Sequence, residues 1–343
     1  MTKIEVIRDY ARKVALMEGF EIGAPLHVSE VTFIPILKPE VPRDEREYLT
    51  LSEALDENLC RIIEKGTEIA YIVFESLSEL PILIEEGEIF QGKGTQDRIA
   101  VGTTMVEPCA KVEISVKCVH APHALHSGAV FGYSGKCSRS MLKELRQMKA
   151  KSAKLGLAAS SISQSRVWSK VSEETASETV IDHTKYEEAI HARQRRVQNR
   201  FKDLEFPKDT IGFAAVTPDG KIGGLEVHRS PRNFRLRKDG ILESLESSIS
   251  WEPTGKGSSS EAQKTVQNTF KKLSELKEED ALNQIEIDGL VINTESFSGE
   301  AFTTAFYSGI CPECGDSKPR KKVCPACGFA ESVMEELAYM SLL

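Results

Sequence analysis

Two copies of the pattern Cys-Pro-x-Cys-Gly lie near the end of the 343-residue chain and constrain its fold more than any other feature. The four cysteines fall within 17 residues, at Cys311, Cys314, Cys324 and Cys327. The glycine after each pair permits a tight turn, so that two thiolates face one ion and four sulfurs complete the tetrahedral shell of zinc. An iron–sulfur cluster, a redox dithiol pair and coincidence are the alternatives. The spacing favours one structural Zn²⁺ that folds a small ribbon, because four thiolates leave no coordination position open for hydrolysis.

The loop between the two cysteine pairs carries four positive charges, at Lys318, Arg320, Lys321 and Lys322. Cations at an exposed tip suit contact with the phosphates of RNA or DNA. A loop that only keeps the ribbon soluble is equally consistent with these charges. From Ala330 onward the spacing of apolar residues predicts a helix that packs back on the body of the protein.

The rest of the chain has the composition of a globular protein, with 40% hydrophobic and 28% charged residues. Its length allows two domains, or one large domain with an appendage. The longest apolar runs, such as residues 69–74, are far shorter than the roughly 20 residues that cross a bilayer, and the first residues lack the apolar stretch of an export signal. We therefore expect a cytoplasmic protein without disulfides among its scattered cysteines, which are Cys60, Cys109, Cys118 and Cys137.

The formal net charge of −8 argues against a surface built throughout to bind phosphates. The charge is unevenly distributed, however, since residues 40–100 carry a net charge of −9 and residues 193–238 one of +7. The basic segment is therefore a second candidate contact for RNA or another acidic partner. Its candidate residues are Arg193, Arg195, Arg196, Arg235 and Arg237. The alternative is that both blocks are solvated faces of helices.

Short segments in which apolar and polar residues alternate follow one another in the first half of the chain. They cover residues 69–74, 82–84, 88–91, 99–101 and 111–119. Alternation of this kind indicates a sheet with one solvated face, which favours antiparallel pairing over a doubly wound parallel sheet. A strand at residues 28–37 precedes them. Thr50 and Glu53 then form a capping box, and apolar residues at helical spacing as far as Ile62 predict a helix.

The character of the chain becomes helical from Ser138 onward. Apolar residues at helical spacing predict three helices, which begin near residues 142, 164 and 186. Strands at 211–216 and 221–227 flank a Thr-Pro-Asp-Gly turn, so they predict a hairpin. Ser230-Pro231 and the pair Ser258 and Glu261 mark the starts of two further helices, and a strand is expected at 285–292.

These elements together predict an α+β fold, with a largely antiparallel, β-rich layer, several packed helices and a small C-terminal zinc ribbon. We expect a helical extension at residues 1–24, which need not belong to the main core. An α+β domain at residues 25–305 follows, and the zinc ribbon with its helix occupies residues 306–343.

A segment between two predicted strands, residues 85–98, combines glycines, amides and charges in an unusual way. Glycines allow the backbone to approach a ligand closely, and Gln96 and Arg98 are the candidate contacts. The spacing matches neither a phosphate-binding loop nor the dinucleotide fingerprint. A polar hairpin crossing is the alternative explanation.

Three histidines, His120, His123 and His126, follow the strand that ends at Cys118. Three imidazoles with an open fourth position can make a Lewis-acid metal site. Pro122 prevents them from sharing a simple helical face, so the spacing fixes no geometry. A surface for a ligand or partner and an ordinary loop are the alternatives.

Several segments in the order of the chain also carry a family resemblance. They are residues 48–55, 86–89 with 96–98, the strand 114–118, residues 164–168, and residues 219–226 followed by Ser230-Pro231. They resemble the ADP-ribosylglycohydrolase and rhodanese-phosphatase-associated protein domain over roughly residues 25–300. The resemblance implies a domain found near nucleotide or ADP-ribose chemistry but no mechanism, because the family is defined by the genes that it accompanies. Where the family continues with Glu-Gln-Gly-Arg-Trp this chain has Val119 to His126, so no role of that Arg or Trp carries over.

Two functions are consistent with the sequence. The first is a non-enzymatic binding or regulatory protein whose zinc ribbon docks on RNA, a ribonucleoprotein such as the ribosome, or a protein. The ribbon, the basic segment and the lack of a complete catalytic constellation favour it. The second is an enzyme or sensor for ADP-ribose or a related nucleotide, which would use residues 87–98 and the histidine loop.

Overall fold

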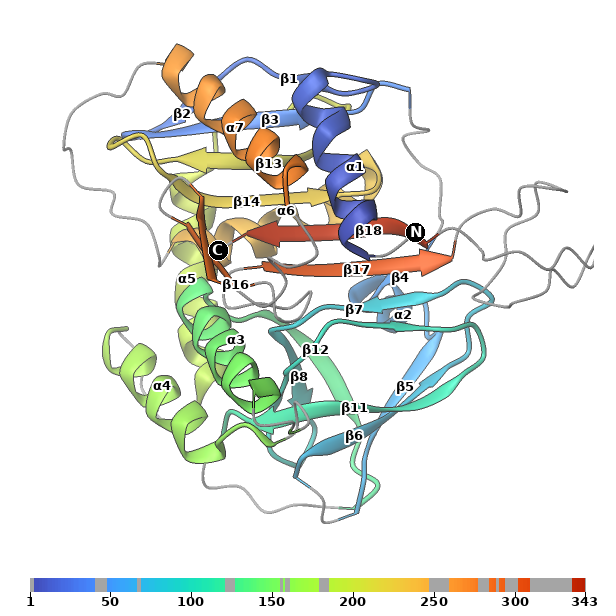
Figure 1. Ribbon diagram of the computed structural model, residues 1–343. Helices are drawn as coiled ribbons and strands as arrows, with labels where there is room; N and C mark the ends of the chain where they lie inside the picture. Colours follow the sequence, from blue (N-terminus) through green and yellow to red (C-terminus); the bar gives the residue numbers. More distant parts are fainter. Residues whose placement is uncertain are drawn as a thin grey trace, which may run out of the picture.

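The structure is a computed structural model and describes residues 3–40, 48–66, 69–120, 127–154, 157, 161–178, 185–246, 259–276, 284–287, 290–293, 302–308 and 335–342. It confirms the predicted α+β class, with antiparallel sheets and helices that pack against them. A large sheet forms the upper part of Figure 1 and a curled half-barrel forms the lower part.

The large sheet has the strand order β1-β3-β13-β14-β18-β17, with β2 paired to β3, and all its pairings are antiparallel. Its strands are β1 (Glu21–Ile22), β2 (Leu26–Val28), β3 (Val31–Leu37), β13 (Thr210–Val216), β14 (Ile222–His228), β17 (Phe302–Ser308) and β18 (Glu335–Leu342). The hairpin predicted around the Thr-Pro-Asp-Gly turn is confirmed as β13 and β14.

Helices cover both faces of this sheet. On one face lie α1 (Lys3–Leu16) and α7 (Ser259–Ser274), where Ala11 and Phe270 are buried in one core with Leu225 (Figure 1). On the opposite face α6 (Pro231–Glu246) buries Phe234 against Phe213. Helix α1 therefore packs into the main core, although the sequence leaves open whether it does.

The half-barrel is an antiparallel sheet in the order β12-β8-β9-β11-β6-β5. Its strands are β5 (Cys60–Glu64), β6 (Tyr71–Ser76), β8 (Glu88–Gly92), β9 (Arg98–Ala100), β11 (Lys111–Cys118) and β12 (Phe131–Lys136). A small sheet of β4 (Leu49–Thr50), β7 (Ile82–Ile84) and β10 (Thr104–Val106) lies beside it. Short helix α2 (Leu51–Asp56) begins at the predicted capping box, in which Thr50 Oγ1 accepts from the backbone N–H of Glu53.

Three helices pack on the outside of the half-barrel. They are α3 (Arg139–Lys154), α4 (Gln164–Ala176) and α5 (Tyr186–Arg200), in agreement with the predicted helical segments. Leu145, Val167 and Ile190 form a core with Ile89 and Ile99 of the sheet. Arg139, the first residue of α3, reaches Gly224 of the large sheet.

Three predictions about secondary structure need correction. Helix α2 ends at Asp56 and Ile62 lies in β5, because Asn58 takes a positive φ of 57° that stops the helix. The expected strand at 285–292 is a hairpin of β15 (Gln284–Ile287) and β16 (Leu290–Asn293).

The third correction concerns the end of the chain. Residues 335–342 form strand β18 and not the predicted helix, because pairing with β14 on one side and β17 on the other overrides the helical spacing. Strands β17 and β18 both belong to the large sheet. The four cysteines and the four cations of the predicted ribbon lie outside the described residues.

Candidate functional site

Six charged or titratable side chains meet in the interior where the half-barrel joins the large sheet. We call them the charged centre: Glu85, Glu88, Lys136, Glu226, His228 and Arg237, each at most 6% exposed. They come from the turn between β7 and β8, from β8, β12 and β14, and from α6. Because each buried ion costs several kcal/mol unless it is paired, this cluster depends on the geometry of its contacts.

The contacts form one continuous chain in which glutamates alternate with basic side chains. Arg237 Nε donates to Glu85 Oε1 at 2.9 Å, and Arg237 Nη1 lies 2.6 Å from Glu88 Oε1. Lys136 Nζ lies 2.7 Å from Glu85 Oε2 and 3.6 Å from Glu226 Oε1. His228 Nε2 ends the chain, 3.3 Å from the same Glu226 oxygen. Lys136 and Arg237 therefore offset much of the negative charge of the three carboxylates inside the protein.

The side-chain periodicity of β14 and α6 explains why these residues point into the same part of the interior. In β14, Leu225 and Val227 enter the core under α1 and α7, so the alternate residues Glu226 and His228 face the half-barrel. In α6, Asn233, Arg237 and Gly240 share one stripe at spacings of four and three. A Cβ added at Gly240 would lie 3.8 Å from Lys136 Cβ, so this stripe of α6 faces β12.

Two glycines allow neighbouring side chains to pack closely beside the charged centre. Gly87 lies between the two glutamates with a φ of 85°, and a Cβ there would lie 2.5 Å from Leu142 and 2.7 Å from the Cys137 sulfur. Gly224 leaves room for the guanidinium of Arg139, since a Cβ would approach its Nη1 to 2.3 Å. These two glycines of the family-like motifs, Gly87 and Gly224, are thus required by packing.

The environment shifts the pKa values of these groups in different directions. Burial alone raises the pKa of Glu85, but Arg237 and Lys136 outweigh it and leave this pKa lowered. The pKa of Glu226 is likewise lowered, because Lys136 and His228 outweigh burial. Burial dominates at Glu88 and raises its pKa. Glu85 and Glu226 are therefore held as carboxylates by their neighbours.

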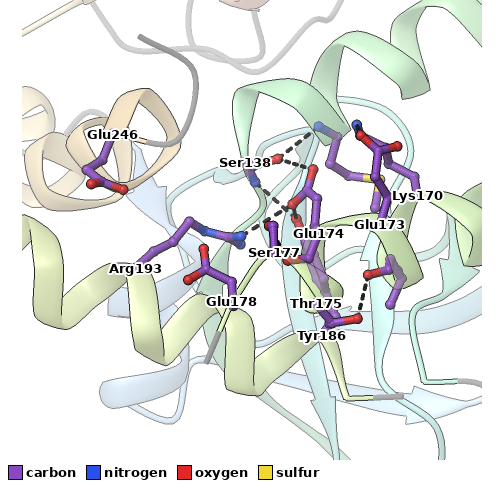
Figure 2. Close-up of polar contacts among 12 residues, drawn as sticks. Ser138, Lys170, Glu173, Glu174, Thr175, Ser177, Glu178, Tyr186, Arg193 and Glu246 are labelled. Carbon is purple, nitrogen blue, oxygen red and sulfur yellow. Dashed lines mark hydrogen bonds and ion pairs between the residues drawn. The ribbon is translucent and has the colours of Figure 1, made fainter. Parts of the chain in front are cut away.

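A second buried cluster lies between α3, α4 and α5 and centres on Glu174 (Figure 2). Ser138 Oγ donates to Glu174 Oε1 at 2.5 Å, and Tyr186 Oη donates to Glu174 Oε2 at 2.6 Å. Arg193 Nη1 donates to the same oxygen at 3.3 Å. Burial raises the pKa of Tyr186, so this phenol stays protonated as a donor. The cluster fixes the first turn of α3 against α4 and α5.

Three of the predicted ligand residues are brought together beside β11. The amide oxygen of Gln96 accepts from Cys118 Sγ at 3.0 Å and from Arg98 Nη1 at 3.3 Å. Arg98 Nη2 donates to Glu64 at 2.8 Å, and His120 Nδ1 lies 3.8 Å from Asp97 Oδ2. All six side chains are buried, and they contact one another as described. His123 and His126 lie outside the described residues.

The structure divides the predicted basic contact residues into two groups. Arg193 and Arg237 are 2% and 6% exposed and pair with glutamates of the two clusters, so they do not reach the surface. Arg196 pairs with Glu178 and Glu246. Arg195 and Arg235 are exposed. The net charge of +7 therefore overstates the basic surface of this segment, because part of it neutralises buried carboxylates.

A hollow of about 380 Å³ lies at the end of the large sheet, between the β13–β14 turn and α7. Glu30, Asp219 and Glu261 line it together with threonines, and it shares no lining residue with either buried cluster. Within the described residues, no group of three or more His, Cys, Asp or Glu side chains is arranged to hold a metal ion. No helix in this part of the chain is long and apolar enough to span a membrane.

Sequence reasoning missed most of the charged centre. No motif or spacing in the sequence marks Lys136 or His228. Arg237 was selected for the opposite reason, as a surface cation. A usable signal did exist in β14, where Glu226 and His228 alternate with Leu225 and Val227 and indicate a polar interior on that face.

Comparison with known proteins identifies one family. The sequence model of the ARG and Rhodanese-Phosphatase-superfamily-associated Protein domain, ARPP-1, matches residues 19–304. Neither a curated protein nor a solved structure matches the chain. The match spans the half-barrel, both buried clusters and most of the large sheet, and it ends inside β17. On this evidence the chain belongs to the ARPP-1 domain family.

Proposed function

We propose that this protein is a non-enzymatic binding or regulatory protein of the cytoplasm, in which a structural zinc ribbon docks on RNA or a ribonucleoprotein such as the ribosome. The observation that carries the proposal is the pairing of β17 with β18, in which Ser308 lies opposite Glu335. All four cysteines and all four loop cations lie between these two residues in the sequence. The segment with the ribbon motif therefore starts and ends at one point of the sheet.

This placement suits a docking module. A segment whose two ends are adjacent strands can be an insertion at the tip of a hairpin, and the body supplies a rigid base for it. The donor set fits zinc, because Cys311, Cys314, Cys324 and Cys327 offer four thiolates in two tight pairs. Zinc bound there supplies folding energy and no open coordination position. Lys318, Arg320, Lys321 and Lys322 lie between the two pairs and would supply the phosphate contacts.

The geometry of the body favours this function over an enzyme or sensor for ADP-ribose. The residues proposed for a nucleotide site, Gln96, Arg98 and His120, are buried, and each of them already contacts another protein side chain. A nucleotide would have to displace these contacts before it could bind. In the charged centre, likewise, the carboxylates already pair with Lys136 and Arg237.

The test is the salt dependence of RNA binding by the full-length, zinc-loaded protein. We expect glutamate at positions 318, 320, 321 and 322 to weaken binding and to lower the slope of log K against log[salt] by about 3, since each phosphate contact contributes about 0.7 on single strands. The matched control reverses two exposed arginines of the body, Arg195→Glu and Arg235→Glu. It should alter the slope much less than the ribbon variant.

Three other outcomes separate the alternatives. Unchanged RNA affinity in the ribbon variant contradicts the proposal. If the protein instead captures another protein, and this binding survives nuclease treatment and is lost in the ribbon variant, the partner is a protein and not RNA. A rise in melting temperature with ADP-ribose that Gln96→Ala or Arg98→Lys abolishes would support the nucleotide function instead.

A further inference from the structure

Helix α6 buries an amide side chain beside the charged centre. Asn233, the third residue of this helix, is 1% exposed. Among the described residues, neither its side-chain nitrogen Nδ2 nor its oxygen Oδ1 has a hydrogen-bond partner. Exchanging the positions of these two atoms would not supply a partner, because both lack one. The backbone N–H, in contrast, donates to Ser230 Oγ at 3.3 Å. The side chain therefore holds one buried donor group and one buried acceptor.

Arg237, one turn further along α6, has a buried donor of the same kind. Its Nε and Nη1 face Glu85 and Glu88, but Nη2 has no hydrogen-bond partner within the part of the chain that the structure describes. Residues four apart share one face of a helix, so Asn233 and Arg237 face the same interior. Two neighbouring side chains of α6 thus present unsatisfied polar atoms to the charged centre.

Glu226 offers an acceptor on the strand that faces this helix. It lies on the face of β14 that α6 covers, since the alternate residues of β14 pack under α1 and α7. Glu226 Oε1 is 3.3 Å from His228 Nε2 and 3.6 Å from Lys136 Nζ. Both distances exceed the usual range of a hydrogen bond, and the oxygen is buried. Donors on α6 and an acceptor on β14 therefore flank one junction.

A water molecule fits this set of groups better than an ion does. Buried polar groups without partners are costly, and native proteins satisfy them with protein atoms or with internal water. Water can accept from Asn233 Nδ2 or Arg237 Nη2 and can donate to Asn233 Oδ1 or Glu226 Oε1. The three carboxylates of the charged centre disfavour an anion, and its two cations disfavour a further cation.

We propose that the charged centre contains an internal water site, formed by Asn233 and Arg237 of α6 with Glu226 of β14 as a further acceptor. The water connects α6 to the large sheet and solvates the carboxylates that the junction buries. Asn233 is the residue that defines the site, because its side chain has no other partner among the described residues. The site goes beyond the proposed function, since it belongs to the body of the protein and uses no residue of the ribbon.

Magnetic relaxation dispersion of the water oxygen nucleus, which counts long-lived internal waters, tests the site on the full-length protein. We expect Asn233→Leu, which is similar in size and has no polar side-chain atom, to reduce the count by one water. Thr269→Val is the matched control, because Thr269 is 0% exposed but donates to the carbonyl of Thr265 at 2.9 Å. It should leave the count unchanged. An unchanged count in N233L overturns the proposal.

The stability of the same variant gives a second test with opposite signs. If water satisfies the amide of Asn233, N233L loses these hydrogen bonds, and the midpoint of urea unfolding falls. If the amide has no partner, leucine removes an unsatisfied polar group and the midpoint rises, which contradicts the proposal.

A crystal structure of the unaltered protein covers the case in which N233L does not fold. Density for a water within hydrogen-bond distance of Nδ2 or Oδ1 of Asn233 supports the site. An amide bound only to protein atoms, or one with no neighbouring water, overturns it. The RNA-binding test of the ribbon uses other residues, so failure of one proposal is distinguishable from failure of the other.

Discussion

The ammonium of Lys136 lies 2.7 Å from the carboxylate of Glu85 in an interior where both side chains are at most 4% exposed. Lys136 also reaches Glu226 of the large sheet, so one side chain of the half-barrel neutralises charges from two parts of the fold. The relative position of the two sheets therefore depends on a polar junction, and apolar packing alone does not define it.

Replacement of Lys136 by Met is expected to destabilise the protein by about 3 kcal/mol, because it leaves Glu226 and part of Glu85 buried without their cation. Denaturant unfolding of the two proteins measures the difference. Lys221→Met is the matched control, since Lys221 pairs with Asp219 on the exposed turn and should not change the midpoint. Equal midpoints for K136M and the unaltered protein would contradict the role assigned to this ion pair.

Substitution of Gly224 by Ala should cost about 1–3 kcal/mol, because the new Cβ would lie 2.3 Å from Arg139 Nη1 and force the guanidinium from its place. Gly102→Ala provides the comparison, since nothing lies within 4 Å of a Cβ at that position. Thermal unfolding of the two variants tests the difference. A tolerated G224A would show that Arg139 can move without loss.

The hydroxyl of Tyr186 donates to Glu174, and Tyr186→Phe should destabilise the protein by about 1.5–3 kcal/mol, the range for hydrogen bonds to charged groups. The same change leaves the backbone N–H of Ser138 without its acceptor, because that donor also binds the phenol oxygen. Ser169→Ala, at an exposed hydroxyl of α4, is the control. Chemical denaturation of Y186F and S169A measures their free energies of unfolding. Equal values would contradict a stabilising role for the hydrogen bond from Tyr186 to Glu174.

Glu243 predicts a pH dependence of stability. Burial raises its pKa from the ordinary value of 4.5 to about 7, although Gln194 donates to its carboxylate. Between these two pH values the folded protein keeps a proton that the unfolded chain has released, so this residue makes stability fall as the pH rises from 4.5 to 7. Above pH 7 its contribution is constant.

Glu243→Gln replaces the carboxyl group by an amide that does not titrate, and it keeps an oxygen that accepts the hydrogen bond from Gln194. The advantage of E243Q over the unaltered protein should grow through the same pH window and reach about 2 kcal/mol at pH 8, after allowance for partial exposure. Unfolding free energies at half-unit pH steps measure it. A constant difference from pH 5 to pH 8 would show that Glu243 does not titrate in this range.

Local patterns in the sequence identify most of the elements of this fold. The alternation in β11, the turn between β13 and β14 and the capping box at Thr50 each appear where the sequence predicts them, because each depends on residues close together in the chain. The family is likewise visible in short motifs of adjacent residues. Helix α2 and the C-terminal tail depart from their patterns where a local φ or a distant strand decides the outcome.

The ion pairs, in contrast, depend on residues that are far apart in the chain. Arg237 and Glu85 are 152 residues apart, yet they meet at 2.9 Å, and only the tertiary structure reveals that the arginine is internal. Sequence alone determined the α+β class and the family, since these depend on spacing along the chain. Tertiary structure decided which cations remain at the surface, because burial and ion pairing depend on contacts between β8, β12, β14 and α6 that no local pattern encodes.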